Sequence, residues 1–122
     1  MLLVDTSIWI DHLRSGDTKL AAMLEKQRVL AHDFVIGEIA LGNLRQRSTV
    51  IVAMNGLPRA TRASATEVLT FIERESLHGL GIGYIDAHLL ASVRLISGSS
   101  LWTRDKRLAK IAEKLAVASS LR

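Results

Sequence analysis

The first seven residues place the tightest constraint on how this chain can fold. Met1 to Val4 form an uninterrupted apolar run, and Asp5, Thr6 and Ser7 follow directly. An apolar run without alternation is typical of a strand buried on both faces, as in a parallel sheet that helices cover. A carboxylate inside such a strand would cost a large desolvation energy, so we expect Asp5 to mark the strand's carboxyl end. Open α/β sheets bind their ligands at this end.

The rest of the chain alternates short strands with longer helical patterns. This order predicts an α/β fold with a central, mostly parallel sheet in one domain, residues 1–122. The expected strands are 29–31 and 99–103, with a terminal edge strand starting near 117. The expected helices begin near residues 8 and 18, cover 34–44, 49–55, 65–76 and 84–97, and begin again at 105.

Composition excludes several classes of protein. Hydrophobic residues make up 48% of the 122 residues, which argues against disorder. The chain has no cysteine, so disulfides, thiolate metal sites and thiol nucleophiles are excluded. No apolar stretch approaches the roughly 20 residues of a membrane span, and Asp5 interrupts the apolar start too early for a signal peptide. We therefore expect a cytoplasmic protein without a membrane partner.

Four acidic residues occupy comparable places in the predicted elements. Asp5 follows the first strand, Asp86 lies in the first turn of a helix, and Asp105 lies between a late strand and the last helix. Glu38 is the only charged residue within an otherwise apolar helix. Strand carboxyl ends and helix amino ends meet at the same edge of an α/β sheet, so three of the four acids should converge.

Each acid also has a purely structural interpretation. Asp86 and Asp105 are suited to helix capping and to the helix dipole, Asp5 can be a turn residue, and Glu38 can form a salt bridge. Four independent structural roles are a less economical explanation than one shared site. Clustered carboxylates repel one another, and a divalent cation removes the repulsion. Oxygen ligands without cysteine favour Mg²⁺ or Mn²⁺, whose bound water can attack a phosphodiester.

Four segments around these acids resemble the PIN-domain ribonucleases, in particular the toxins of VapBC-type toxin–antitoxin systems. The segments occur in the family's order and span nearly the whole chain. They are Val4-Asp5-Thr6-Ser7-Ile8-Trp9, Val35-Ile36-Gly37-Glu38-Ile39-Ala40-Leu41-Gly42, Gly83-Tyr84-Ile85-Asp86-Ala87-His88-Leu89-Leu90-Ala91 and Leu101-Trp102-Thr103-Arg104-Asp105-Lys106-Arg107-Leu108.

The resemblance implies a three-layer α/β/α fold and a Mg²⁺- or Mn²⁺-dependent endoribonuclease. Asp5, Glu38 and Asp86 match the family's core ligands, and Asp105 matches its fourth acid. Many relatives carry a further acid just after this position, where this chain has Lys106 and Arg107. The family also implies a homodimer and a VapB-type antitoxin whose C-terminal segment lies in a groove near the site.

Other polar residues have supporting roles in this interpretation. Thr6, Ser7 and Thr103 could orient water, phosphate or the carboxylates, and they are equally suited to turns. Arg104, Lys106 and Arg107 are candidate contacts to the RNA backbone. Lys and Arg number 16 against 12 Asp and Glu, so committing four acids to a metal leaves 16 cationic and 8 anionic side chains, a net +8 that suits a phosphate polymer. Aromatic residues are too scarce for a prominent base-stacking surface.

Two other functions remain open from sequence. One is a phosphoryl-accepting domain of the receiver type, which requires paired early acids and an acceptor Asp after a middle strand; neither is present. A covalent adduct on Asp5 after incubation with a phosphoryl donor would support it. The other is a non-catalytic RNA- or protein-binding module on the same fold, which the complete set of four acids disfavours.

Overall fold

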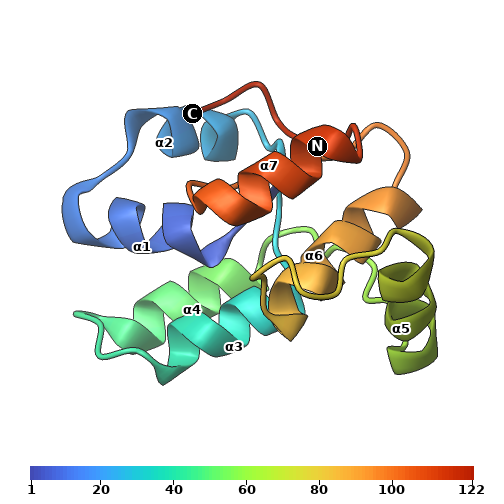
Figure 1. Ribbon diagram of the computed structural model, residues 1–122. Helices are drawn as coiled ribbons and strands as arrows, with labels where there is room; N and C mark the ends of the chain where they lie inside the picture. The colour runs from blue at the N-terminus through green and yellow to red at the C-terminus, as the bar shows by residue number, and fades with distance from the viewer.

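The computed structural model describes residues 1–122 as seven helices around a three-stranded sheet (Figure 1). The element boundaries confirm the α/β prediction. The strands are β1 (Leu2–Val4), β2 (Val29–Leu30) and β3 (Ser100–Trp102). The helices are α1 (Thr6–Ser15), α2 (Thr18–Glu25), α3 (Asp33–Leu41), α4 (Arg47–Asn55), α5 (Ala65–Arg74), α6 (Tyr84–Leu95) and α7 (Lys106–Lys114).

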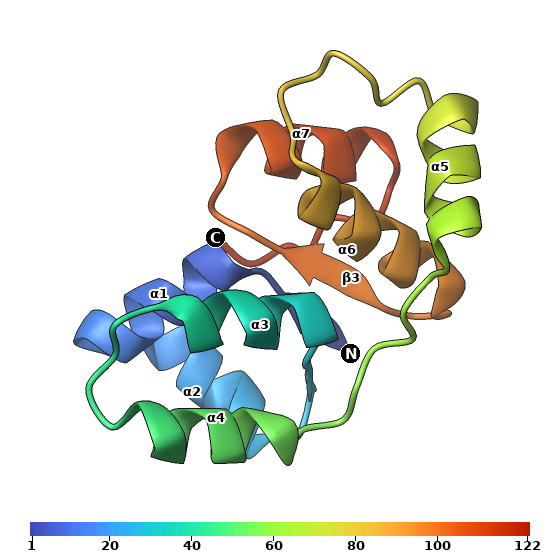
Figure 2. The same cartoon turned by 90° about the horizontal axis from the view of Figure 1, so that it is seen from below.

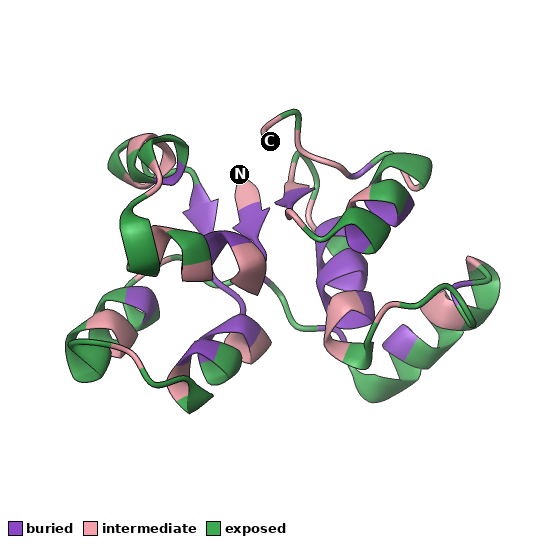
Figure 3. Ribbon diagram, turned by 60° about the vertical axis from the view of Figure 1, so that its left-hand side comes forward, coloured by how far each residue is buried: buried purple, intermediate pink, exposed green.

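The first strand is the centre of the sheet. The strand order is β2-β1-β3 and both pairings are parallel, with Leu2 opposite Val29 on one side and opposite Ser100 on the other. Leu3 and Val4 are completely buried, and Figure 3 shows the strands in the interior between helices. Because both neighbours of β1 run parallel to it, the residues that follow β1 and β3 emerge at the same edge of the sheet.

Helices cover the sheet on both sides, which gives the expected three layers. Figure 2 shows α1 to α4 grouped on one side, and α6 and α7 on the other with α5 packed outside α6. The main core draws residues from both groups, including the fully buried Leu20, Leu90 and Leu108. The sheet edge that carries Asp5 therefore lies between two helical groups. No helix of the structure combines the length and apolarity needed to cross a membrane.

Side-chain caps determine where several helices begin. Asp17 accepts from the Leu20 amide at 2.9 Å, and Ser64 forms a reciprocal capping box with Glu67. The cap of α3 is His32, whose Nδ1 accepts from the Phe34 amide at 3.0 Å. A histidine in this role gives no signal in sequence, because Asp33 beside it is the commoner capping residue type.

Several expected boundaries differ from the structure. The first helix begins at Thr6 instead of residue 8, because Asp5 already caps it. The helix expected over 34–44 ends at Leu41, where Gly42 takes an extended conformation. The terminal strand expected near residue 117 is reduced to one bridge between Leu101 and Ala118.

Candidate metal centre

The four acidic residues come from four different elements. Asp5 ends β1 and caps α1, and Asp105 follows β3 and caps α7. Asp86 lies in the first turn of α6, and Glu38 lies in the second half of α3. The parallel pairing of β1 with β3 brings Asp5 and Asp105 to one sheet edge, as the strand pattern predicted.

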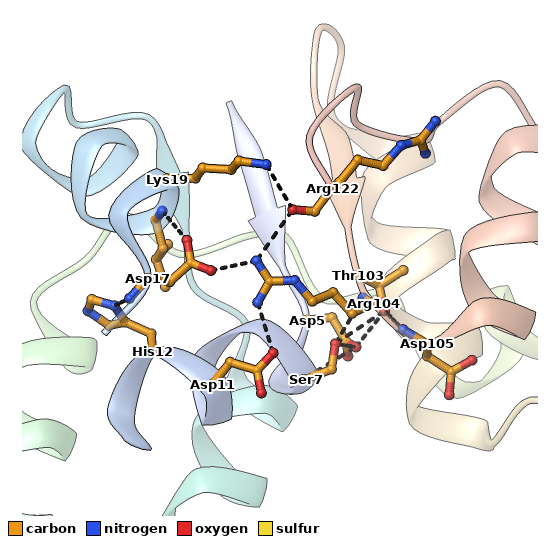
Figure 4. A network of polar contacts seen from close by, with 11 residues as sticks. Asp5, Ser7, Asp11, His12, Asp17, Lys19, Thr103, Arg104, Asp105 and Arg122 are labelled. Carbon is orange, nitrogen blue, oxygen red and sulfur yellow. Dashed lines mark hydrogen bonds and ion pairs between the residues drawn. The ribbon is translucent and has the colours of Figure 1, made fainter. Parts of the chain in front are cut away.

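Asp5 is held in a fixed orientation by two hydroxyl groups. The side chain is only 6% exposed, and its Oδ2 accepts from Ser7 Oγ and from Thr103 Oγ1, each at 2.7 Å. Each hydroxyl in turn accepts from a backbone amide, Ser7 from Arg104 and Thr103 from Asp105, both at 3.1 Å. An ionised carboxylate can only accept, so both hydroxyls donate to Asp5 while they accept from the amides (Figure 4). The other oxygen, Oδ1, receives no hydrogen bond from the protein and is the atom available to a ligand.

Glu38 is positioned by the residue next to Asp5. Thr6 Oγ1 donates to Glu38 Oε1 at 2.7 Å, and this bond connects α1 to α3. Glu38 is exposed and forms no salt bridge, so the structural ion pair considered from sequence is absent. The hydroxyl groups of Thr6, Ser7 and Thr103 thus all donate to one of two of these acids, Asp5 or Glu38.

Electrostatics show that the four acids lie close enough to interact. Burial raises the pKa of Asp86, and the negative charges of Asp5, Asp105 and Glu38 raise it further. A hydrogen bond from the Gly83 amide to Asp86 Oδ2, at 3.2 Å, opposes these effects. The carboxylates therefore repel one another, and the half-buried Asp86 is the one that this repulsion affects most clearly.

The protein supplies no cation to this cluster. None of its six ion pairs involves Asp5, Glu38, Asp86 or Asp105. A buried carboxylate among other acids needs a counter-ion, and four carboxylates are a suitable donor set for a hard divalent cation. No three acidic or histidine side chains form a ready-made cage. Mg²⁺ requires no such cage, because it takes few protein carboxylates and completes its coordination with water and phosphate.

The basic residues around Asp105 differ in their surroundings. Arg104 donates to Asp11 at 2.8 Å and to Asp17 at 2.5 Å (Figure 4). Its guanidinium carbon lies 5.5 Å from the Trp102 ring centroid. Lys106 and Arg107 are exposed and form no ion pair. The sequence did not indicate that Asp11 and Asp17 pair with Arg104, because partners so distant along the chain leave no local pattern.

Comparisons with known proteins identify the family and the fold of this chain. A family model described as the PIN domain matches residues 2–114. Proteins named Ribonuclease VapC32 from two strains of Mycobacterium tuberculosis are 43% identical over 118 residues, which covers 97% of this chain and 95% of each relative. The crystal structure of FitAcB from Neisseria gonorrhoeae superposes with a TM-score of 0.63 over 97% of this chain and 95% of that chain. At 19% identity, this last similarity bears on the fold alone.

Proposed function

Because this chain belongs to the PIN-domain family, we propose that it is a metal-dependent endoribonuclease and the toxin of a VapBC-type toxin–antitoxin pair. The relatives named Ribonuclease VapC32 share 43% identity over nearly the whole chain, which supports the same activity here. The observation that carries the proposal is the set of four interacting carboxylates that includes the buried Asp5, to which the protein supplies no cation.

Asp5, Glu38 and Asp86 are the proposed ligands of Mg²⁺ or Mn²⁺, with Asp105 as a fourth acid. When bound, such an ion activates water and stabilises charge on a phosphodiester. The protein's own contribution is orientation. Ser7 and Thr103 occupy Asp5 Oδ2 so that Oδ1 stays free, and Thr6 fixes one oxygen of Glu38. The proposed reaction is hydrolysis of an RNA phosphodiester to a 3′-hydroxyl and a 5′-phosphate.

Two exposed cations at the start of α7 are the proposed contacts to the RNA backbone. Lys106 and Arg107 directly follow Asp105 and have no ion-pair partner. Arg104 has a different role in this proposal. Its ion pairs to Asp11 and Asp17 commit the guanidinium to the protein, while its amide orients Ser7.

A cleft of about 580 Å³ beside Glu38 is the proposed binding place of a VapB-type antitoxin segment. It lies between α1 and the α3–α4 region and combines apolar and basic side chains, which suits an amphipathic acidic segment. Its lining includes Ile10, Leu13, Arg14, Leu44, Arg45 and Val50. A stoichiometric amount of antitoxin from the adjacent reading frame should suppress cleavage.

We also propose that the protein is a homodimer, which sedimentation equilibrium would test.

The direct test of the activity is cleavage of RNA by the purified protein. Mg²⁺ or Mn²⁺ should permit cleavage, and EDTA should abolish it. Asp5→Asn keeps the size of the side chain but removes a ligand charge, so cleavage should fall by at least about 100-fold. End sequencing of the fragments should find 5′-phosphates. Cleavage that persists both in EDTA and in Asp5→Asn would contradict the proposal.

A further inference from the structure

Two aromatic residues that lie far apart in the sequence pack against one buried histidine, His88. The rings of Phe34 in α3 and Tyr84 in α6 each lie 4.7 Å, centroid to centroid, from the ring of His88 and are nearly perpendicular to it. Tyr84 is 50% exposed, and its hydroxyl forms no hydrogen bond within the protein. Both tryptophans, by contrast, are buried in the core. The scarce aromatic residues therefore do produce one ring cluster, in which Tyr84 is exposed, Phe34 is partly exposed and His88 is buried.

This cluster belongs to the same helical segments as the catalytic acids. Phe34 lies four residues before Glu38 in α3, and residues at this spacing share one face of a helix. Tyr84 and Asp86 both lie in the first turn of α6, where Asp86 accepts from the amide of Gly83. Two helices, α3 and α6, therefore carry both the rings and two of the four acids.

A cation borders the ring cluster. The Arg62 guanidinium carbon lies 5.7 Å from the Phe34 ring centroid, and the side chain is 55% exposed. Arg62 and Arg59 share a single carboxylate, Asp33. Two cations with one acid leave a positive charge beside the aromatic surface, which favours an anionic ligand.

The base of the cluster is rigid. His32 is completely buried, accepts from the Phe34 amide and lies 3.1 Å from Ser92 Oγ through its Nε2. Its ring lies 5.3 Å from that of Phe34. A ring held from beneath in this way loses little side-chain entropy when a ligand packs on it.

We propose that Tyr84, supported by the rings of His88 and Phe34, forms a stacking subsite for an unpaired RNA base next to the cleaved phosphodiester, and that Arg62 contacts a neighbouring phosphate. This inference deepens the proposed function and rests on it. A base inside a duplex has both faces covered by its neighbours, so the subsite selects single-stranded segments. Stacking accepts every base, and it therefore adds affinity without reading the sequence.

The test measures binding without cleavage, in an Asp5→Asn background. Fluorescence anisotropy compares a random-sequence single strand of about 12 nucleotides with an abasic strand of the same length. Tyr84→Ala should weaken binding of the strand with bases about 10-fold, or ~1.4 kcal/mol, and leave binding of the abasic strand unchanged. Tyr84→Phe keeps the ring and should stay close to the parent protein. The control is Leu69→Ala on α5, which truncates a residue that is similarly exposed, at 58%.

Arg62→Gln should behave differently from the tyrosine variant. It should weaken the binding of the strand with bases and of the abasic strand equally. It should also reduce the slope of log affinity against log salt concentration by about one. The inference is overturned if Tyr84→Ala affects both strands alike or neither, or if a duplex of the same length binds as well as the single strand. A change in molar mass on sedimentation of Tyr84→Ala would also overturn it, by showing that the rings contact a second copy. If the parent protein binds RNA and only the tyrosine result fails, the inference alone is wrong. If the parent protein binds no RNA, the proposed function fails as well.

Discussion

At the scale of the residue, two hydrogen-bond directions decide which oxygen of Asp5 is available. Ser7 and Thr103 both donate to Oδ2, because a carboxylate oxygen can only accept, and each hydroxyl also accepts from a backbone amide. The sequence predicted Asp5 at the strand end and polar residues near it. It did not predict that both hydroxyls bind one oxygen, because that depends on the register between β1 and β3.

Thr103→Val replaces the hydroxyl with a methyl group of similar size. It removes a hydrogen bond to Asp5 and leaves the Asp105 amide without its acceptor. We expect the affinity for Mn²⁺ to fall about 10- to 100-fold, as for other groups that orient metal ligands. Thr103→Ser keeps the hydroxyl and should bind nearly as the parent protein does. Calorimetric titration with Mn²⁺ measures both, and equal affinities for the two variants would contradict the proposed role of the hydroxyl.

His32 couples folding stability to pH. Its pKa is lowered from 6.5 to about 4, chiefly by burial, so the folded state keeps the ring neutral where the unfolded chain protonates it. The unfolded state therefore binds more protons between pH 6.5 and about 4, and the free energy of unfolding should decrease as the pH falls through this window. The difference in pKa corresponds to roughly 3 kcal/mol.

The matched variant for this prediction is His32→Asn, whose amide does not titrate. Urea unfolding from pH 7 to pH 4 should give a visibly smaller pH slope for the variant than for the parent protein. The two slopes must be compared because Asp86 has a raised pKa, and its protonation increases the free energy of unfolding as the pH falls in part of this range. This change opposes that of His32. Equal slopes in the two proteins would contradict the role of His32.

At the scale of the element, Arg104 joins three parts of the chain. Its side chain contacts Asp11 in α1, Asp17 at the start of α2 and the backbone oxygen of Arg122 (Figure 4). From sequence, its position beside Asp105 indicated an RNA contact as for Lys106. The direction of a side chain after a strand depends on the conformation of the turn. Here the side chain of Arg104 points toward α1 and α2.

Arg104→Gln and Lys106→Gln should therefore have opposite phenotypes. The first breaks two ion pairs and should lower the free energy of unfolding by about 1–2 kcal/mol. The second should leave stability within about 0.5 kcal/mol, weaken RNA binding and reduce its salt slope by about one. Urea unfolding and anisotropy titrations at several salt concentrations measure the two effects. Similar RNA-binding losses without loss of stability would show that both residues contact RNA.

At the scale of the whole molecule, the fold was largely predictable because its signals are local. Apolar runs marked the strands, helical patterns starting near residues 18 and 65 marked α2 and α5, and alternating elements indicated a parallel sheet. The convergence of Asp5 with Asp105 followed from topology. The ring cluster of Phe34, Tyr84 and His88 did not, because it depends on how α3 and α6 pack.

The central claim is that acids from both helical groups form one metal site, and one melting experiment tests it directly. Asp86→Asn keeps an oxygen that can accept from Gly83 but removes a charge that repels Asp5, Asp105 and Glu38. Without metal, the variant should melt at or above the temperature of the parent protein. Mn²⁺ at about 100 times its Kd should stabilise the parent protein by about 2.7 kcal/mol and the variant by much less. A variant that melts far below the parent without metal, yet gains as much from Mn²⁺, would show that Asp86 serves the helix and not a metal.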